Sequence, residues 1–189
     1  MHRTIETARR PVILRTTTIA DAAALRDIRL EALRTVSYAF GSSFEEENQF
    51  PDDEWQRRAV RGDGSGSQAT YVVVDPSDPS SLVGLTGISR GTRAKDNHSA
   101  TIFSVYVRPA WRGLRISDAL MESCVSWAAE RDVKIVRLSV ATTNLPARKC
   151  YERCGFVITG VDPALIYCDG KYYDEHMMSR ILDPELRRA

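Results

Sequence analysis

The sequence predicts an α/β protein with a mixed β-sheet, and three observations support this class. Strand-like runs of β-branched and aromatic residues dominate the first part of the chain, strand-like and helix-like segments alternate after residue 100, and two further strand-like runs close the sequence. The 189 residues, 43% hydrophobic and 27% charged, suffice for one domain with its own core. We expect that domain at residues 11–183, between a flexible leader at 1–10 and a tail at 184–189.

The first expected elements are a strand and a helix. Residues 12–18 are rich in β-branched side chains, which favours a strand. Thr18 and Asp21 then stand close to the spacing of a capping box, which indicates a helix start. The apolar residues that follow recur at helical intervals, namely Ala22, Leu25, Ile28, Ala32 and Val36.

The next segment is expected to be irregular before a second helix and a hairpin. Residues 37–51 combine glycine and serines with an acidic run, which is typical of a loop or a broken helix. Pro51 and the acids after it predict a helix start. Beyond the glycine-rich connection at 61–67, residues 70–74 and 82–89 predict two strands joined by a turn.

The second half of the chain predicts a strand–helix–strand unit and then further elements. Residues 100–107 and 135–140 are strand-like, and the segment between them carries a helical apolar stripe. That stripe consists of Ile116, Leu120, Cys124 and Trp127. We expect one more helix from Asn144 to Gly155. Two final strands, at 156–160 and 172–181, should flank a loop containing proline, aspartate and glycine.

Charge and cysteine usage exclude several kinds of partner. With 26 basic and 25 acidic residues the formal net charge is +1, so no global field favours nucleic acid or an anionic membrane. The four cysteines form no CxxC pair and no zinc-type spacing, so we expect free thiols, a reducing compartment and no metal. Since no apolar run matches a signal or a membrane span, a cytoplasmic location is expected.

An anion site is predicted where residues 105–120 pass from a strand through a basic turn into a helix. The free amides of a helix N-terminus attract anions, and Arg112 and Arg115 would stand beside them. A pyrophosphate could be held there by backbone and side chains together. Neither GxGxxG nor GxxxxGK[ST] occurs in the chain, which argues against a nucleotide-binding module.

This stretch resembles the central motif of the GNAT N-acetyltransferases, in which V-x-P is followed by R/Q-x-x-G-x-G/A. The resemblance implies that a strand and the turn after it bind the pantetheine arm and the pyrophosphate of coenzyme A. The implied residues are Val105, Tyr106, Val107, Arg112, Gly113, Leu114, Arg115, Ile116 and Ser117. Arg115 replaces the usual second glycine and Ser117 the final Gly/Ala, and we expect Arg115 to add an ion pair to a phosphate.

Residues 144–156 resemble a second GNAT signature, N-x-x-A-x-x-x-Y followed by glycine and an aromatic residue. Asn144, Ala147 and Tyr151 fall near one face of a helix, because residues three and four apart are neighbours. The resemblance implies that Asn144 contacts the pantetheine, that Ala147 lets it pass closely, and that Tyr151 stands beside the sulfur. A phenol can donate a proton or a hydrogen bond to a departing thiolate while staying protonated at neutral pH.

Together the two motifs imply a GNAT fold, with a mixed, mostly antiparallel sheet of about seven strands flanked by about four helices. They also imply an acyltransferase acting on groups other than aminoacyl groups. It would move the acetyl group of acetyl-CoA to a primary amine of a small molecule or peptide by direct attack, with Tyr151 protonating the thiolate. An amide of Tyr106 or Val107 would bind the oxyanion. The alternative is a catalytically silent acyl-CoA sensor of the same fold.

Several side chains could accept the proton of the amine. Glu46, within the acidic run of residues 45–47, is the selected base, while His98 and residues 174–176 are comparable alternatives. An acidic lip would favour a cationic acceptor such as an amine, an amino acid or a polyamine. The sequence is also compatible with a homodimer.

Overall fold

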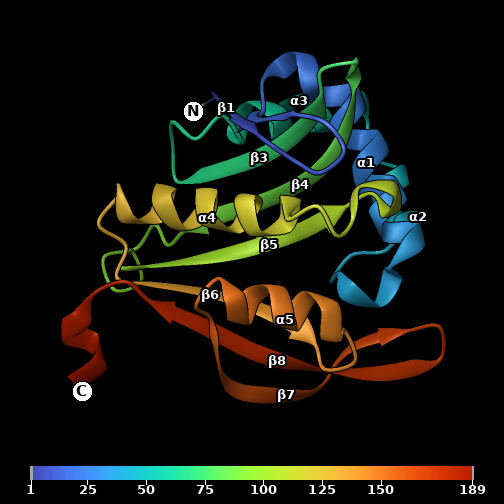
Figure 1. Cartoon of the computed structure of the whole chain (residues 1–189). Coiled ribbons are helices and arrows are strands. Elements are labelled where there is room, and N and C mark those ends of the chain that lie inside the picture. The colour runs from blue at the N-terminus through green and yellow to red at the C-terminus, as the bar shows by residue number, and fades with distance from the viewer. Residues whose placement is uncertain (1, 189) are drawn as a thin grey trace.

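The computed structural model describes the backbone of residues 2–188 and the side chains of residues 2–186, and it has three layers. An eight-stranded sheet with the order β1-β2-β3-β4-β5-β6-β8-β7 lies between two groups of helices. Figure 1 shows α4 and α5 on one face, with α1 and α3 on the other. All neighbouring strands pair antiparallel except β5 and β6, which are parallel.

The elements have the following bounds. The strands are β1 His2–Ile5, β2 Val12–Thr16, β3 Gln68–Asp75, β4 Asp78–Arg90, β5 Ser99–Val107, β6 Ile135–Ala141, β7 Val157–Cys168 and β8 Lys171–Ile181. The α-helices are α1 Ala22–Thr35, α2 Phe44–Asn48, α3 Asp52–Arg61, α4 Ile116–Ala129 and α5 Leu145–Arg153. Short 3-10 helices are η1 Ile19–Asp21, η2 Ser37–Ala39, η3 Pro109–Trp111 and η4 Pro184–Arg188.

The core fills both faces of the central strands. On β3, Tyr71 and Val73 belong to the cluster under α4, whereas Val72 and Val74 belong to the cluster under α1. Successive side chains of a strand point to opposite faces, so a strand covered by helices on both sides is apolar throughout. This is why β3 reads as a continuous apolar run.

Three segments differ from the sequence-based expectation. Residues 2–5 of the expected leader form β1, a polar edge strand that pairs with β2 and has no apolar alternation to reveal it. The loop expected after residue 160 is mostly strand, because Pro163 lies in the edge strand β7 at a shift of register. The expected tail contains η4, and Met1 and Ala189 lie outside the described residues. Within residues 2–188 the sheet thus has eight strands and the fold five α-helices, slightly more than expected.

The β5–β6 pair determines where a ligand can enter. Only Ser99–Thr101 pair with Ile135–Arg137, although both strands continue well beyond these residues. Past that short seam the two strands diverge, and their facing edges have no ladder between them. The sheet therefore opens into a wedge at the carboxyl ends of two parallel strands, a place where α/β sheets commonly bind ligands.

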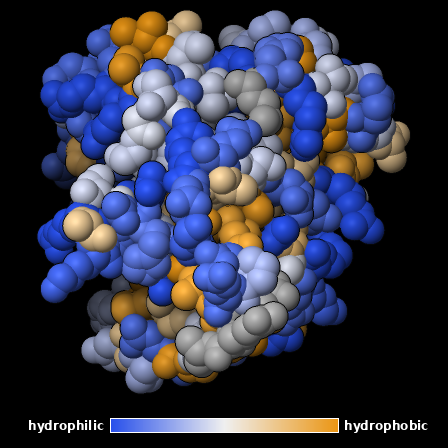
Figure 2. Space-filling model, turned by 90° about the vertical axis from the view of Figure 1, so that its left-hand side faces the viewer, coloured by the Kyte–Doolittle hydropathy of each residue, from blue (hydrophilic) through white to orange (hydrophobic). Residues whose placement is uncertain are grey.

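The surface near the chain ends is mainly hydrophilic. Figure 2 shows this side of the molecule, with hydrophobic residues confined to small patches. Among the described residues, no helix is both long and apolar enough to cross a membrane.

Candidate active site

A groove of about 630 Å³ opens at the wedge. Its walls come from η2, the end of β5, the turn into α4 and the first part of α5. The groove brings together all but one of the residues implied as cofactor contacts, namely Val105, Tyr106, Val107, Arg112, Gly113, Arg115, Ile116, Ser117, Asn144, Ala147 and Tyr151. The exception is Leu114, whose side chain packs against the core.

The turn between β5 and α4 leaves the helix start open. Gly113 and Arg115 have φ values of 78° and 61°, so both adopt the left-handed conformation that turns the chain sharply into α4. Arg115 is the N-cap residue and its side chain makes no capping hydrogen bond. The first amides of this 14-residue helix therefore remain available to an anion.

The charges around this turn also suit a phosphate group. The Arg115 side chain is 76% exposed and pairs with Asp118 at 3.2 Å. Arg153 reaches the same carboxylate at 2.8 Å. Burial opposes ionisation of Asp118, but hydrogen bonds from Arg153 and Cys150 keep its pKa below the ordinary value. Arg112 also lines the groove, so the lining at this end contains three arginines and one carboxylate, a balance of charge that suits an anion.

A β-bulge lies at the middle of the site. The pairing of β4 with β5 shifts register where Leu85 faces Tyr106 and Gly87 faces Phe103, and Ser104 has a φ of 56°. The shift lies in the strand that was expected to supply the amide for the oxyanion. A bulge leaves an extra residue outside the ladder, so a backbone amide here can turn toward a ligand. The bulge precedes Tyr106 and Val107, whose pairing with β4 is regular.

The second motif forms α5, one wall of the groove. The Asn144 side chain caps this helix by accepting a hydrogen bond from the Ala147 amide at 3.3 Å. Tyr151 is 7% exposed and lines the groove. Its hydroxyl makes no hydrogen bond within the part of the chain that the structure describes, which leaves it available to a ligand. Burial, together with the charges of Cys150, Cys154 and Glu175, raises the pKa of Tyr151.

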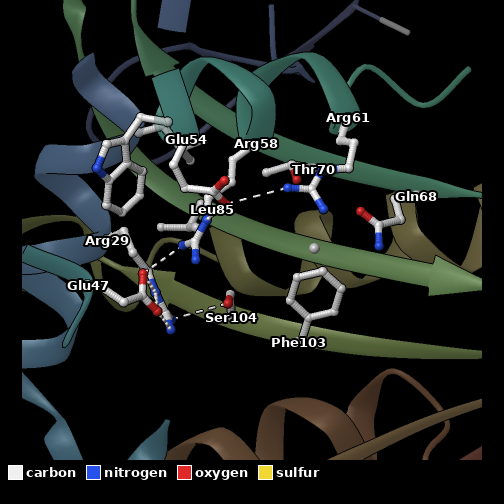
Figure 3. Close-up of a pocket in the computed structure, with 13 residues that line it drawn as sticks. Arg29, Glu47, Glu54, Arg58, Arg61, Gln68, Thr70, Leu85, Phe103 and Ser104 are labelled. Atoms are coloured by element: carbon white, nitrogen blue, oxygen red, sulfur yellow. Dashed lines mark hydrogen bonds and ion pairs between the residues drawn. The ribbon is translucent and has the colours of Figure 1, made fainter. Parts of the chain in front are cut away.

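A second cavity, of about 360 Å³, lies on the opposite side of the bulge (Figure 3). Ser104 lines this cavity while its neighbour Val105 lines the groove, so both spaces adjoin β5 at the bulge. Glu47 is buried here between Arg29 at 2.7 Å and Arg58 at 2.7 Å. Burial opposes its ionisation. The hydrogen bonds and charge of Arg29, a hydrogen bond from Ser42 and the charge of Arg58 outweigh burial and lower the pKa of Glu47 to about 2.

The acids of residues 45–47 therefore differ in their surroundings. Glu46 is exposed, forms the capping box of α2 with Ser43, and lines neither the groove nor the cavity beside the bulge. Glu45 is exposed as well. Glu47 remains ionised and fully engaged by arginines, which makes it a poor proton acceptor at neutral pH.

The other base candidates lie directly before β5 and on β8. His98 is exposed and precedes β5, roughly 20 Å along the strand from Val105. Asp174 accepts a hydrogen bond from the Ala164 amide at 2.8 Å. Glu175 is 5% exposed, and the Nδ1 atom of His176 is buried without a partner among the described residues. Of these candidates, Glu175 is the one whose charge acts on Tyr151.

Some groove residues could not be found from the motifs. Tyr38 and Phe40 come from η2 and its end, far away in the sequence, and Tyr38 stacks on Tyr173 with ring centroids 5.2 Å apart. Thr143 stands just before the second motif. The aromatic residues of the expected loop at 37–51 were the available signal, because aromatic side chains in a loop often wall a binding site.

Three potential metal ligands also meet beside the groove. Asp118, Cys150 and Cys154 present ligand atoms within 4.8 Å of one another. Cys150 donates to Asp118 at 3.0 Å, and two arginines already neutralise that carboxylate. The four cysteines are free thiols, as expected.

Comparisons with known sequences agree with this geometry. The family model described as Acetyltransferase (GNAT) family matches residues 24–156. The L-amino acid N-acetyltransferase AaaT of Escherichia coli (strain K12) is 29% identical over 134 residues, which are 69% of this chain and 76% of that protein. A streptothricin acetyltransferase of Escherichia coli is 35% identical over 66 residues, which are 35% of this chain and 38% of that protein.

Solved structures share the fold at lower identity. An acetyltransferase of the GNAT family from Streptococcus pneumoniae has a TM-score of 0.79 and 20% identity, covering 91% of this chain and 99% of that one. The yncA structure from Salmonella typhimurium, with its cofactor acetyl-CoA, has a TM-score of 0.75 and 18% identity, covering 91% and 94% of the two chains. The family match spans both motifs and the wedge between them, and the chain belongs to the GNAT acetyltransferase family.

Proposed function

We propose that this chain transfers the acetyl group of acetyl-CoA to a primary amine by direct attack, with Tyr151 assisting departure of the thiolate. The observation that carries the proposal is the position of Tyr151, buried at the wall of the groove with its hydroxyl unbonded among the described residues. Acetyl-CoA supplies the acetyl group as a thioester. The open N-terminus of α4 and its arginines would hold the pyrophosphate, and the diverging edges of β5 and β6 would hold the amides of the pantetheine arm.

In this reaction the carbon–nitrogen bond forms while the carbon–sulfur bond breaks. An amide of the Ser104–Val105 bulge would donate to the carbonyl oxygen as negative charge develops on it. The raised pKa keeps Tyr151 protonated throughout the neutral range, so its hydroxyl acts as a donor to the departing sulfur and not as a base. The attacking nitrogen loses one proton to bulk water while the sulfur gains one, so the step is balanced in protons. We assign no side chain as general base, because Glu46 caps α2 and Glu47 stays paired with Arg29.

The test is a free-thiol release assay with acetyl-CoA and a panel of amines. Tyr151→Phe should lower kcat by roughly 100-fold or more, the lower end of general acid catalysis, with the KM for acetyl-CoA little changed. Tyr172→Phe is the matched control, because Tyr172 is 71% exposed on β8 and lines neither the groove nor the cavity beside the bulge.

The two outcomes separate the enzyme from a silent sensor. Amine-dependent thiol release that falls in Tyr151→Phe and persists in Tyr172→Phe supports the proposal. Calorimetry showing tight coenzyme A binding without turnover of any amine would favour the acyl-CoA sensor instead. Equal activity of the two variants would remove Tyr151 from the mechanism.

A further inference from the structure

The cavity beside the bulge has more hydrogen-bond donors than acceptors to offer a ligand. Its charged lining consists of three arginines, Arg29, Arg58 and Arg61, and two glutamates, Glu47 and Glu54. Every carboxylate oxygen of the two glutamates already accepts a hydrogen bond from an arginine. The lining therefore has one surplus positive charge and no unengaged carboxylate oxygen.

The unengaged donors gather at one end of the cavity. Arg61 approaches Glu54 only at 3.5 Å through a single nitrogen, and its side chain is 57% exposed. The side chains of Gln68 and Thr70 make no hydrogen bond within the described part of the chain. In Figure 3 the guanidinium of Arg61 extends from the end of α3 over the sheet toward Thr70 and Gln68. A carboxylate placed there would receive donors from all three side chains.

The pairing of the strands fixes how far this end lies from the bulge. Thr70 of β3 is paired with Gly87 of β4, and Gly87 with Phe103 of β5, directly before Ser104. Two strand spacings separate the backbones at the two ends, about 10 Å. Since Arg61 and Gln68 reach into this space, a small ligand that spans the remaining distance can place its anion near them and its amine near Ser104.

The floor of the cavity is built for a small ligand. A Cβ atom at Gly87 would lie 2.4 Å from the Phe103 ring, so glycine is needed for the ring to lie across β4. The ring gives the cavity an apolar floor between its two polar ends (Figure 3). A volume of about 360 Å³ is at the small end of ligand pockets.

We infer that the acceptor is a small primary amine carrying a carboxylate or a similar anion, which Arg61, Gln68 and Thr70 bind while the amine faces the bulge. This inference rests on the proposed acetyl transfer and narrows its acceptor. It reverses the expectation that the acidic run attracts a cationic acceptor, because Glu47 already forms ion pairs with Arg29 and Arg58.

The experiment compares matched acceptors in the thiol release assay. The common L-amino acids, and ω-amino acids from β-alanine to aminohexanoate, are each set against the amine that lacks the carboxylate. The wild type should acetylate a carboxylate-bearing member with the higher kcat/KM. Arg61→Gln should raise the KM for that acceptor roughly 10- to 100-fold, the effect of one charge-assisted hydrogen bond, and leave the KM for acetyl-CoA and the rate with the matched amine unchanged.

Arg93→Gln is the control, since Arg93 is exposed and lines neither the cavity nor the groove. Preference for the amines without a carboxylate, or an equal effect of Arg61→Gln on both members of a pair, would overturn the inference while leaving acetyl transfer intact. If no amine of either class releases thiol, the proposed function fails first. Calorimetry of the same amino acids with the coenzyme A-saturated protein then tests the anion site alone, and absence of Arg61-dependent binding overturns it.

Discussion

Glu47 should make the stability of this protein depend on pH in a way that one substitution removes. Its side chain is 3% exposed and lies between Arg29 and Arg58. The pKa of the carboxyl falls from 4.5 to about 2 in the folded protein, which corresponds to about 3 kcal/mol in the free energy of unfolding. Because the folded pKa is the lower one, this stabilisation is present above pH 5 and is lost as the pH falls toward 2.

The measurement is urea denaturation of the wild type and Glu47→Gln at several pH values between 6 and 3. At pH 6 the variant should be less stable by about 3 kcal/mol or more, since the buried Arg29 and the half-buried Arg58 lose their shared partner. At pH 3 the difference in the free energy of unfolding between the two proteins should be smaller by about 2 kcal/mol. The unfolded wild type is then protonated at Glu47, so folding must release that proton before the ion pair forms. Glu45→Gln, at an exposed position of the same short helix, controls for the loss of an acid.

A gap between the wild type and Glu47→Gln that stays constant from pH 6 to pH 3 would refute this reasoning. It would mean that the carboxylate contributes through packing alone and that the arginines are satisfied without it. The inference about the acceptor would then lose its premise as well, because a carboxylate free of arginines could receive a cationic amine.

Three further predictions concern the backbone and the thiols. At Arg115, whose φ is 61°, glycine should leave the free energy of unfolding unchanged or raise it slightly, whereas valine should lower it by about 1–2 kcal/mol in the same urea assay. At Ser104, whose φ is 56°, glycine should preserve acetyl transfer while valine, strained in the bulge, should reduce kcat; equal rates would argue against a role for the bulge geometry. Burial raises the pKa of Cys124 to about 12, so a thiol reagent at pH 8 should label the half-buried Cys168 in the native protein and Cys124 only in urea, as mass spectrometry of the labelled peptides would show.

Local patterns in the sequence predicted most of the elements that form the groove. The strand ending at Val107, the turn through Gly113 and the helix after Asn144 each carry a signal within a few residues, and the structure confirms all three elements. The polar strand at residues 2–5 has no such signal, since it depends on the edge that β2 offers it. The position of β7 was also not predictable from local residues. Pro163 indicated a loop, but β7 is an edge strand, and an edge strand tolerates proline.

The acceptor side could not be predicted because its electrostatics depend on contacts between distant residues. Glu45, Glu46 and Glu47 are equivalent in the sequence, yet one is exposed, one caps a helix and one is buried between arginines. Glu47 differs from the other two because it pairs with Arg29 of α1 and Arg58 of α3. Ion pairs between three helices determine which charged groups remain available to a ligand. The spacing of residues along the chain does not reveal these pairs.

The short seam between β5 and β6 has a mechanical consequence. Because only Ser99–Thr101 and Ile135–Arg137 join the two halves of the sheet, the hydrogen-bonded ladder offers little resistance to bending along that line. A ligand in the groove touches β5 on one side and α5 on the other, so it ties the halves together where the ladder does not. Binding should therefore stiffen the whole sheet, and amide hydrogen exchange in β6 and β8 should slow most when the groove is filled.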